Sequence, residues 1–308
     1  GYVQSVPDPE TFIGSQFLPE DQTFSLEFVY DIFESNRTMA STVAWDTEAP
    51  IKGRPAISQV SGSVAPIKDK FRFSEKELIT LRNPRVPAEK EEVRRQFLVN
   101  TDDLILGIRD RYEWFRWQVL ANGAINYDRK KVKINIDFGV PDNQKITYDT
   151  LAKGWDDPTA DILGNIRAWV KIYKDNNRGV APDVMVTSSD VIFAMQQNQA
   201  VKNAIFGHAE SQIIVTQDSL NQVLRASGLP GVVAYDASVA DEDEMGNQGT
   251  SVPLIPAGRV CFLKRHTPQT QVGWLKVGPT AENEYSPGIW AGSYSERDPR
   301  IEYILAVS

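Results

Sequence analysis

The residue types that carry out covalent catalysis are scarce in this chain, which has one cysteine and two histidines among 308 residues. Cys261 lies in the apolar run 260–263 (VCFL), which is typical of a buried strand and not of an exposed nucleophile. His208 and His266 stand outside any metal or catalytic motif. The zinc-protease, paired-cysteine, nucleophile-elbow and P-loop motifs are all missing. The sequence therefore predicts no catalytic residue and no cofactor.

The acidic run 241–246 (DEDEMG) is the segment that most resembles a metal site. It begins like a calcium loop, with acids at its first and third positions and glycine at its sixth. Met245 and Val252 then stand at the fifth and twelfth positions, where such a loop needs oxygen ligands. We therefore expect no metal here. The expected structure is a solvated loop that carries Asp241, Glu242, Asp243 and Glu244.

Residues 87–121 have the spacing of one long amphipathic helix. Pro87 occupies the favoured first turn, and Glu89, Glu91 and Glu92 place negative charge near the positive end of the helix dipole. Apolar residues then recur at three-, four- and seven-residue steps, namely Val93, Phe97, Leu104, Ile108, Tyr112, Phe115 and Val119. At 1.5 Å per residue this helix would be about 50 Å long, close to the diameter of a compact chain of this size. The spacing predicts the spine of an extended subunit.

Two tryptophans lie at a three-residue step beside this apolar stripe. Trp114 and Trp117 could belong to the core of the chain or to an intersubunit face, and the spacing leaves both interpretations open. Asn122-Gly123 supplies the stop signal of the helix.

Residues 42–82 alternate apolar and polar types between prolines and glycines, which predicts an exposed hairpin with its turn at residues 61–63 (SGS). The part from 44 to 73 has five basic and three acidic residues, the basic ones being Lys52, Arg54, Lys68, Lys70 and Arg72. An isolated two-stranded ribbon is marginally stable in water. One interpretation is an ordinary solvated hairpin. We favour a second one, an arm that lies on a neighbouring subunit, because a long lone helix follows the hairpin in the sequence.

The remaining segments predict an arm, a second hairpin and an α/β domain. Residues 1–41 form the arm, with a short helix at 23–35, and a strand at 132–138 pairs with 145–148. Residues 155–270 alternate strands and helices. The expected strands are 184–187, 213–216, 232–235 and 259–264, and the expected helices are one capped at Asp157 and ending near 177, then 189–196, 200–206 and 217–226. Strands at 272–277 and 301–307 close the chain.

Composition excludes several classes of protein. No run of 18 apolar residues exists, and the first nine residues lack the features of a secretory signal, so neither a membrane span nor a leader is expected. One cysteine excludes an internal disulfide. The net charge of −8 argues against a sequence-independent nucleic-acid binder, because such proteins carry excess Lys and Arg.

This order of elements resembles the capsid proteins of tailed bacteriophages, and in particular the lambda-type major capsid protein family. The resemblance covers nearly the whole chain. Its most specific part is the C-terminus, where Trp290, Tyr294 and the segment 298–302 (DPRIE) lead into an apolar strand. The resemblance implies an α+β, HK97-like capsid fold and a subunit that assembles into the hexamers and pentamers of an icosahedral shell around double-stranded DNA.

The resemblance also implies a division into parts. Residues 1–41 would be the N-terminal arm, 42–82 the E-loop and 83–153 the P-domain with its spine helix. Residues 154–270 would be the A-domain, with the acidic loop near the centre of each capsomer, and 271–308 would return to the P-domain. Intersubunit contacts would then involve the basic residues of the ribbon, the three glutamates that open the long helix, and the two tryptophans.

Partners follow from the same resemblance. They are other copies of the chain, packaged double-stranded DNA without sequence-specific contacts, and decoration, scaffolding and portal proteins, with no membrane. Assembly would take place in the host cytoplasm and the product would be the virion capsid. In some relatives a lysine of the E-loop forms an isopeptide bond with an asparagine of a neighbouring subunit. Lys52, Lys68 or Lys70 could form such a bond. The lambda-type family, however, implies noncovalent contacts.

Two alternatives remain. An encapsulin-like compartment would share the fold but enclose enzymes in place of DNA. An α/β enzyme built on residues 155–270 would need a pocket with converging polar groups and perturbed pKa values.

Overall fold

The computed structural model describes residues 6–7, 9–33, 57–63, 66–82, 87–129, 132–147, 153–207, 214–242, 248–270, 272–297 and 300–308. The chain divides into two compact units. Unit 1 contains residues 1–20 and 106–275, and unit 2 contains residues 21–105 and 276–308. The chain passes between the units inside the long helix α2 and again at the short paired strands β1 (Glu20–Gln22) and β12 (Leu275–Val277).

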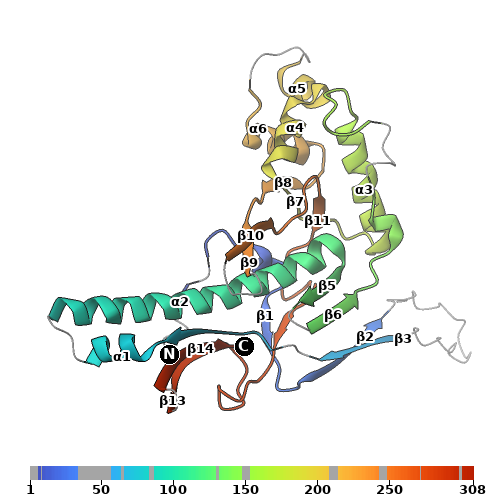
Figure 1. The fold of residues 1–308 in the computed structure, drawn as a ribbon. Helices are drawn as coiled ribbons and strands as arrows, with labels where there is room; N and C mark the ends of the chain where they lie inside the picture. The colour runs from blue at the N-terminus through green and yellow to red at the C-terminus, as the bar shows by residue number, and fades with distance from the viewer. Residues whose placement is uncertain are drawn as a thin grey trace, which may run out of the picture. The chain divides into compact units, whose positions relative to one another are not determined.

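The long helix is confirmed. Helix α2 spans Pro87–Trp117 and continues as one π-helical turn, η3, at Gln118–Asn122 (Figure 1). Gly123 ends it in the left-handed conformation at φ 68°, which glycine adopts without steric cost. The side chains that the helix buries follow helical spacing and include Thr101, Leu104, Ile105, Ile108, Tyr112, Glu113, Arg116, Trp117 and Ala121. The expected stripe is therefore confirmed at Leu104, Ile108 and Tyr112, whereas Phe115 and Val119 are only partly buried. Two charged residues lie within the buried face.

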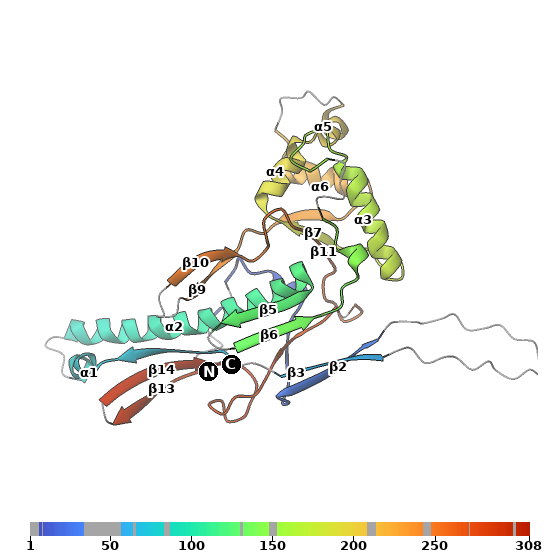
Figure 2. The same ribbon diagram turned by 45° about the vertical axis from the view of Figure 1, so that its right-hand side comes forward.

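The hairpin expected within residues 42–82 is wrong in its described part, because residues 57–63 and 68–73 do not pair with each other. Residues 42–56 lie outside the described residues. Strand β3 (Ile57–Ser63) pairs with β2 (Glu27–Phe33), and strand β4 (Lys68–Phe73) pairs with the C-terminal strand β14 (Arg300–Val307). The predicted turn at residues 61–63 lies inside β3, where Gly62 is opposite Phe28. Helix α1 (Glu75–Arg82) follows β4. Figure 2 shows β2 and β3 running side by side as a ribbon.

The helix expected at residues 23–35 is also wrong, since β2 occupies most of this range. The segment EFVYDIF is rich in aromatic and β-branched residues, which fit a pleated strand better than a helix. Strand β14 is the centre of the other sheet in unit 2, with β4 on one side and β13 (Trp290–Arg297) on the other.

Unit 1 contains the expected α/β domain (Figure 1). Its sheet has the order β11-β7-β8, with β7 (Val184–Thr187) parallel to β8 (Gly231–Ala234) and antiparallel to β11 (Val260–Leu263). The helices are α3 (Ile162–Asn176), α4 (Ser189–Gln197), α5 (Gln199–Phe206) and α6 (Gln217–Ala226). Their buried apolar residues form one core with the sheet, which includes Ile166, Met185, Met195, Leu220 and Val232.

Two boundaries in this domain differ from the prediction. The carboxylate that caps α3 belongs to Asp161, which accepts a 3.0 Å hydrogen bond from the Gly164 amide, whereas Asp157 accepts from Thr159. The described part of the expected strand at 213–216 is not a strand. Ile214 is exposed there, and Thr216 serves as the N-cap of α6. Residue 213 lies outside the described residues.

Two hairpins and two short 3₁₀ turns complete unit 1. Strand β5 (Ala124–Arg129) pairs with β6 (Val132–Asp137), so the partner expected for this strand at 145–148 is wrong. The preceding segment is the nearer partner, and it begins directly after the stop at Gly123. Strand β9 (Ser238–Glu242) pairs with β10 (Gln248–Pro253). The 3₁₀ turns are η2 (Gly14–Gln16) and η4 (Asp142–Gln144).

Candidate functional site

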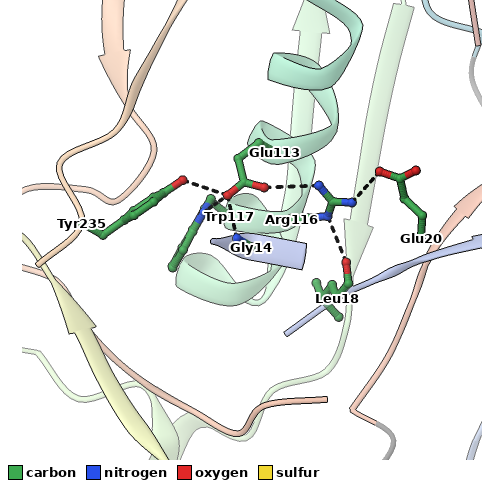
Figure 3. A network of polar contacts seen from close by, with 7 residues as sticks. All are labelled: Gly14, Leu18, Glu20, Glu113, Arg116, Trp117 and Tyr235. Atoms are coloured by element: carbon green, nitrogen blue, oxygen red, sulfur yellow. Dashed lines mark hydrogen bonds and ion pairs between the residues drawn. The ribbon is translucent and has the colours of Figure 1, made fainter. Parts of the chain in front are cut away.

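A buried carboxylate on helix α2 is the centre of the most extensive polar network among the described residues. The side chain of Glu113 is 0% exposed, and its Oε1 accepts three hydrogen bonds of 2.8 Å each (Figure 3). The donors are the backbone amide of Gly14, the indole Nε1 of Trp117 and the hydroxyl of Tyr235. Three segments that are distant in the sequence therefore meet at one oxygen atom in unit 1.

Arg116 extends this network toward the N-terminal segment. Its guanidinium donates to Oε2 of Glu113 at 3.3 Å, to the carbonyl oxygen of Leu18 at 2.9 Å and to the carboxylate of Glu20 at 2.9 Å (Figure 3). Arg116 is only 6% exposed, so its charge needs the partners that Glu113 and Glu20 provide. Each buried charge in the network is paired and hydrogen-bonded.

Helical spacing brings the residues of the network together on α2. Glu113, Arg116 and Trp117 stand at positions i, i+3 and i+4, which are neighbours on one helix face. Trp117 stacks on Tyr235 with ring centres 4.6 Å apart and meets the edge of Phe17 at 6.4 Å. Burial, followed by the charge of Glu113 and its hydrogen bond, raises the pKa of Tyr235, so this hydroxyl remains a neutral donor.

The N-terminal segment can approach the network because residue 14 is glycine. A Cβ atom on Gly14 would lie 2.6 Å from Oε2 of Glu113, which is far inside contact distance. Phe17 is 1% exposed in the same core as Trp117 and Tyr235. Part of the expected N-terminal arm is therefore an internal component of unit 1. Of these network residues, the sequence analysis singled out Trp117, as a core or an intersubunit residue, and not Glu113, Arg116, Gly14 or Tyr235. A Glu and an Arg within an apolar helix face were a usable signal.

The acidic run 241–244 is only partly a loop. Asp241 lies on β9 and forms ion pairs with Arg111 at 3.0 Å and Arg129 at 2.6 Å. The guanidinium of Arg111 is 5.3 Å from the ring centres of both Trp114 and Tyr127. Asp241 therefore links β9 to α2 and β5 through its ion pairs. The expectation that Asp241 lies in a solvated loop is wrong. Glu242 ends β9, and Asp243 and Glu244 lie outside the described residues.

The basic residues predicted for the ribbon lie partly in the sheet. Lys68, Lys70 and Arg72 are on strand β4, and Lys68 forms an ion pair of 2.7 Å with Glu282. Lys52 and Arg54 lie outside the described residues.

The glutamates and tryptophans of α2 lie in different surroundings. Glu89 is in the first turn, and Glu91 and Glu92 are exposed; Arg95 holds the pKa of Glu92 below its ordinary value through a hydrogen bond and its charge. Trp114 is half-buried. Trp117 is 0% exposed, so an intersubunit contact at Trp117 is wrong, because the core of unit 1 already covers this side chain.

Described residues of unit 1 line a groove with a volume of about 1090 Å³ and a smaller cavity of about 340 Å³. The groove is lined by aromatic side chains such as Trp155, Trp169 and Phe262. Within the described residues, no group of three or more His, Cys, Asp and Glu side chains is placed to hold a metal ion. Burial raises the pKa of the Cys261 thiol to about 12, which opposes formation of a thiolate. In the same part of the chain, no helix has the length and apolar character needed to cross a membrane.

Known structures define the class of this fold. The chain is similar to the crystal structure of a candidate capsid protein of a prophage from E. coli CFT073, with a TM-score of 0.61, 13% identity, and coverage of 99% of this chain and 90% of that one. It is also similar to a phage-related protein from Bordetella bronchiseptica RB50, with a TM-score of 0.52, 12% identity, and coverage of 99% and 89%. The fold is the mixed α+β fold of HK97-like phage capsid proteins, as predicted.

A match to a family model over nearly the whole chain identifies the family. Residues 1–306 match the family model described as phage major capsid protein E, and the chain belongs to this family. It is thus a major capsid protein with a structural role in the virion shell, and it assembles with copies of itself. The narrower lambda-type assignment stays a prediction.

Proposed function

We propose that the chain builds an icosahedral shell of hexamers and pentamers that encloses double-stranded DNA. Membership of the phage major capsid protein E family over residues 1–306 supports this proposal. The shell is held by many modest contacts between copies, and symmetry repeats each contact over the whole particle. The chain has no catalytic role in this proposal.

The observation that carries the mode of assembly is the ribbon of β2 and β3. Within the described residues these two strands pair with each other over seven residue pairs and with no third strand. A two-stranded ribbon of this kind is marginally stable in water. A neighbouring copy supplies the missing support, and the arm is therefore built on β2 and β3, without β4.

The other parts keep the roles that were expected for them. The P-domain comprises residues 83–153 with the C-terminal strands of 271–308, and β4 is assigned to it as well because it pairs with β14. The A-domain is residues 154–270, and the acidic run 241–244 lies near the capsomer centre. The pairing of Asp241 with Arg111 and Arg129 supports a fixed base for the β9–β10 hairpin.

Contacts between copies involve charged residues at several of the predicted positions. Lys52 and Arg54 at the arm face carboxylates of a neighbour, and the exposed Glu91 and the first-turn Glu89 of α2 are such carboxylates. Glu92 contributes less because Arg95 already neutralises it. Trp114 remains a candidate contact because it is only half-buried.

The shell works with further partners and at a defined place. Decoration, scaffolding and portal proteins meet it during assembly in the host cytoplasm, and the contents are DNA and not a cargo enzyme. The net charge of −8 supports weak contact with the contents, because like charges on shell and DNA repel.

Electron microscopy of the purified protein tests the assembly. Closed shells with five- and six-fold capsomers are expected, and a species that stays strictly monomeric at high concentration contradicts the proposal. The contents of native particles test the second part. Nuclease-protected double-stranded DNA is expected after disruption, whereas an enclosed enzyme would assign the particle to the encapsulin-like class.

A further inference from the structure

One face of the β13-β14-β4 sheet in unit 2 combines cations with aromatic rings. Residues that are directly opposite in antiparallel strands point to the same face. Tyr303 is opposite both Arg72 and Tyr294, and the next positions on that face bring in Lys70 and then Lys68. We call this the basic face, and define it as Lys68, Lys70, Arg72, Tyr294 and Tyr303.

The aromatic rings hold the central cation in place. Tyr294 and Tyr303 are stacked with ring centres 5.1 Å apart. The ammonium nitrogen of Lys70 is 4.1 Å from the ring centre of Tyr303 and 3.3 Å from the hydroxyl of Tyr294. The charge of Lys70 is therefore positioned in advance, which reduces the conformational entropy lost when an anion binds.

The basic face is exposed at its cations and at Tyr294, whereas Val307, which is opposite Lys68, is 0% exposed. On the opposite face of β14, Ile304 is 1% exposed and Ala306 is 0% exposed. The three cations on β4 are exposed, and Tyr294 is 39% exposed. The sheet therefore offers its cations to the surroundings, while the opposite face buries Ile304 and Ala306 but leaves Phe71 40% exposed.

The spacing of the cations suits a regular polyanion. Lys68, Lys70 and Arg72 alternate along an edge strand, which places them in a line at steps of about 6.6 Å. Successive phosphates along a nucleic-acid strand are separated by a similar distance. One carboxylate, that of Glu282, competes for Lys68. The strand register also places Glu296 two positions from Tyr294 on this side of β13. Three cations against two carboxylates leave this face slightly positive, in a chain whose net charge is −8.

We propose that the basic face contacts the phosphate backbone of the enclosed DNA without reading its sequence. This inference rests on the proposed function, in which the shell encloses double-stranded DNA. The tyrosine hydroxyls add neutral donors to the cations, and both kinds of group bind phosphate oxygens. Three phosphate contacts give only weak DNA binding by a single copy. In a shell many copies bind the same DNA together, which raises the total affinity. The excess negative charge elsewhere keeps the DNA from adhering to the whole wall.

Salt-dependent binding of a short DNA duplex of random sequence to the unassembled subunit tests the inference. Three phosphate contacts predict a slope of log affinity against log salt of about −2.7. Exchange of two cations, in the variant K68Q/R72Q, should reduce the slope to about −0.9 and weaken binding roughly a hundredfold at about 50 mM salt. Lys70 is retained because its ring contacts stabilise the sheet.

The variant K133Q/K171Q is the matched control. It removes the same charge from exposed lysines of unit 1, and its slope should equal that of the wild type. Equal losses in the two variants, or a wild-type subunit that binds no DNA, overturn the inference.

Shell formation by the same variants separates this inference from the proposed function. If K68Q/R72Q keeps the wild-type slope but no longer forms shells in the electron microscope, the basic face binds carboxylates of a second copy and the inference is wrong. If wild-type shells form and enclose DNA but the free subunit has no salt-dependent binding, this inference fails alone. Absence of wild-type shells contradicts the proposed function, whatever the slope.

Discussion

The hydroxyl of Tyr235 donates a 2.8 Å hydrogen bond to Oε1 of Glu113, and the two residues are 122 positions apart in the sequence. Tyr235 follows β8 of the α/β domain, and Glu113 lies on α2. The same oxygen binds the amide of Gly14, so one carboxylate joins the N-terminal segment, the helix and the domain. A buried charge with several partners favours the single arrangement in which all partners are present.

Removal of the Tyr235 hydroxyl should destabilise unit 1. The variant Tyr235→Phe keeps the ring stacked on Trp117 but leaves Glu113 with one donor fewer, and the expected loss is about 1–3 kcal/mol of unfolding free energy. Urea unfolding of the unassembled subunit measures this. Tyr285→Phe is the control, because Tyr285 is 76% exposed and its change should lie within about 0.5 kcal/mol. Equal effects of the two variants would show that the bond contributes nothing.

Two glycine substitutions should change stability in opposite directions. In Gly14→Ala the new methyl group would lie 2.6 Å from the Glu113 carboxylate, and the forced displacement should cost about 1–3 kcal/mol. Gly107→Ala lies within α2, where nothing is within 4 Å of the new atom, and should stabilise the helix by about 0.5–1 kcal/mol. Both are measured by urea unfolding. A neutral Gly14→Ala would mean that the N-terminal segment can shift away from Glu113.

The stability of the α/β domain should depend on the protonation of Asp183. Burial alone would raise its pKa, but hydrogen bonds from Lys264 Nζ at 2.6 Å and the Arg265 amide at 3.0 Å, with the charges of both residues, hold the pKa below its ordinary value. A carboxyl with a lowered pKa contributes stability above its unfolded pKa, near 4, and loses it as pH falls through the folded value.

The variant Asp183→Asn tests this pH dependence. Its loss of unfolding free energy should be the same at pH 7 and pH 5, and should shrink as the pH falls below about 4. Asp128→Asn is the control, since the ion pair of Asp128 with Lys133 is exposed and 3.5 Å long and should contribute little at any pH. A deficit for Asp183→Asn that stays constant down to pH 2 would contradict the prediction.

Cys261 should be inert to alkylation while the protein is folded. Its side chain is 6% exposed, and burial raises the pKa of the thiol to about 12. At pH 8 the thiolate fraction should be about a thousandfold below that of a free cysteine, whose pKa is about 8.5. Labelling with iodoacetamide, followed by mass spectrometry, should give modification only in denaturant. Rapid stoichiometric labelling of the folded subunit would show that the strand β11 is open.

The sequence by itself determined the elements whose hydrogen bonds are local. Helix α2 and its stop at Gly123, and helices α4 to α6, follow from spacing and capping residues, because each helical bond joins residues four positions apart. The burial of β7, and of Cys261 and Leu263 on β11, follows in the same way from their apolar runs. The order of these elements was also enough for the resemblance to phage capsid proteins, which the family match confirms.

Only the tertiary structure decided which distant segments meet. Strand pairing is non-local, so the alternation of residues 57–73 could not reveal that β3 joins β2 and that β4 joins β14 near the end of the chain. The same limit applies to Glu113 and Trp117. Spacing placed them on one helix, but their role depends on Gly14 and Tyr235, which reach them through folding of the whole of unit 1. Partners in space are set by packing, which no local pattern encodes.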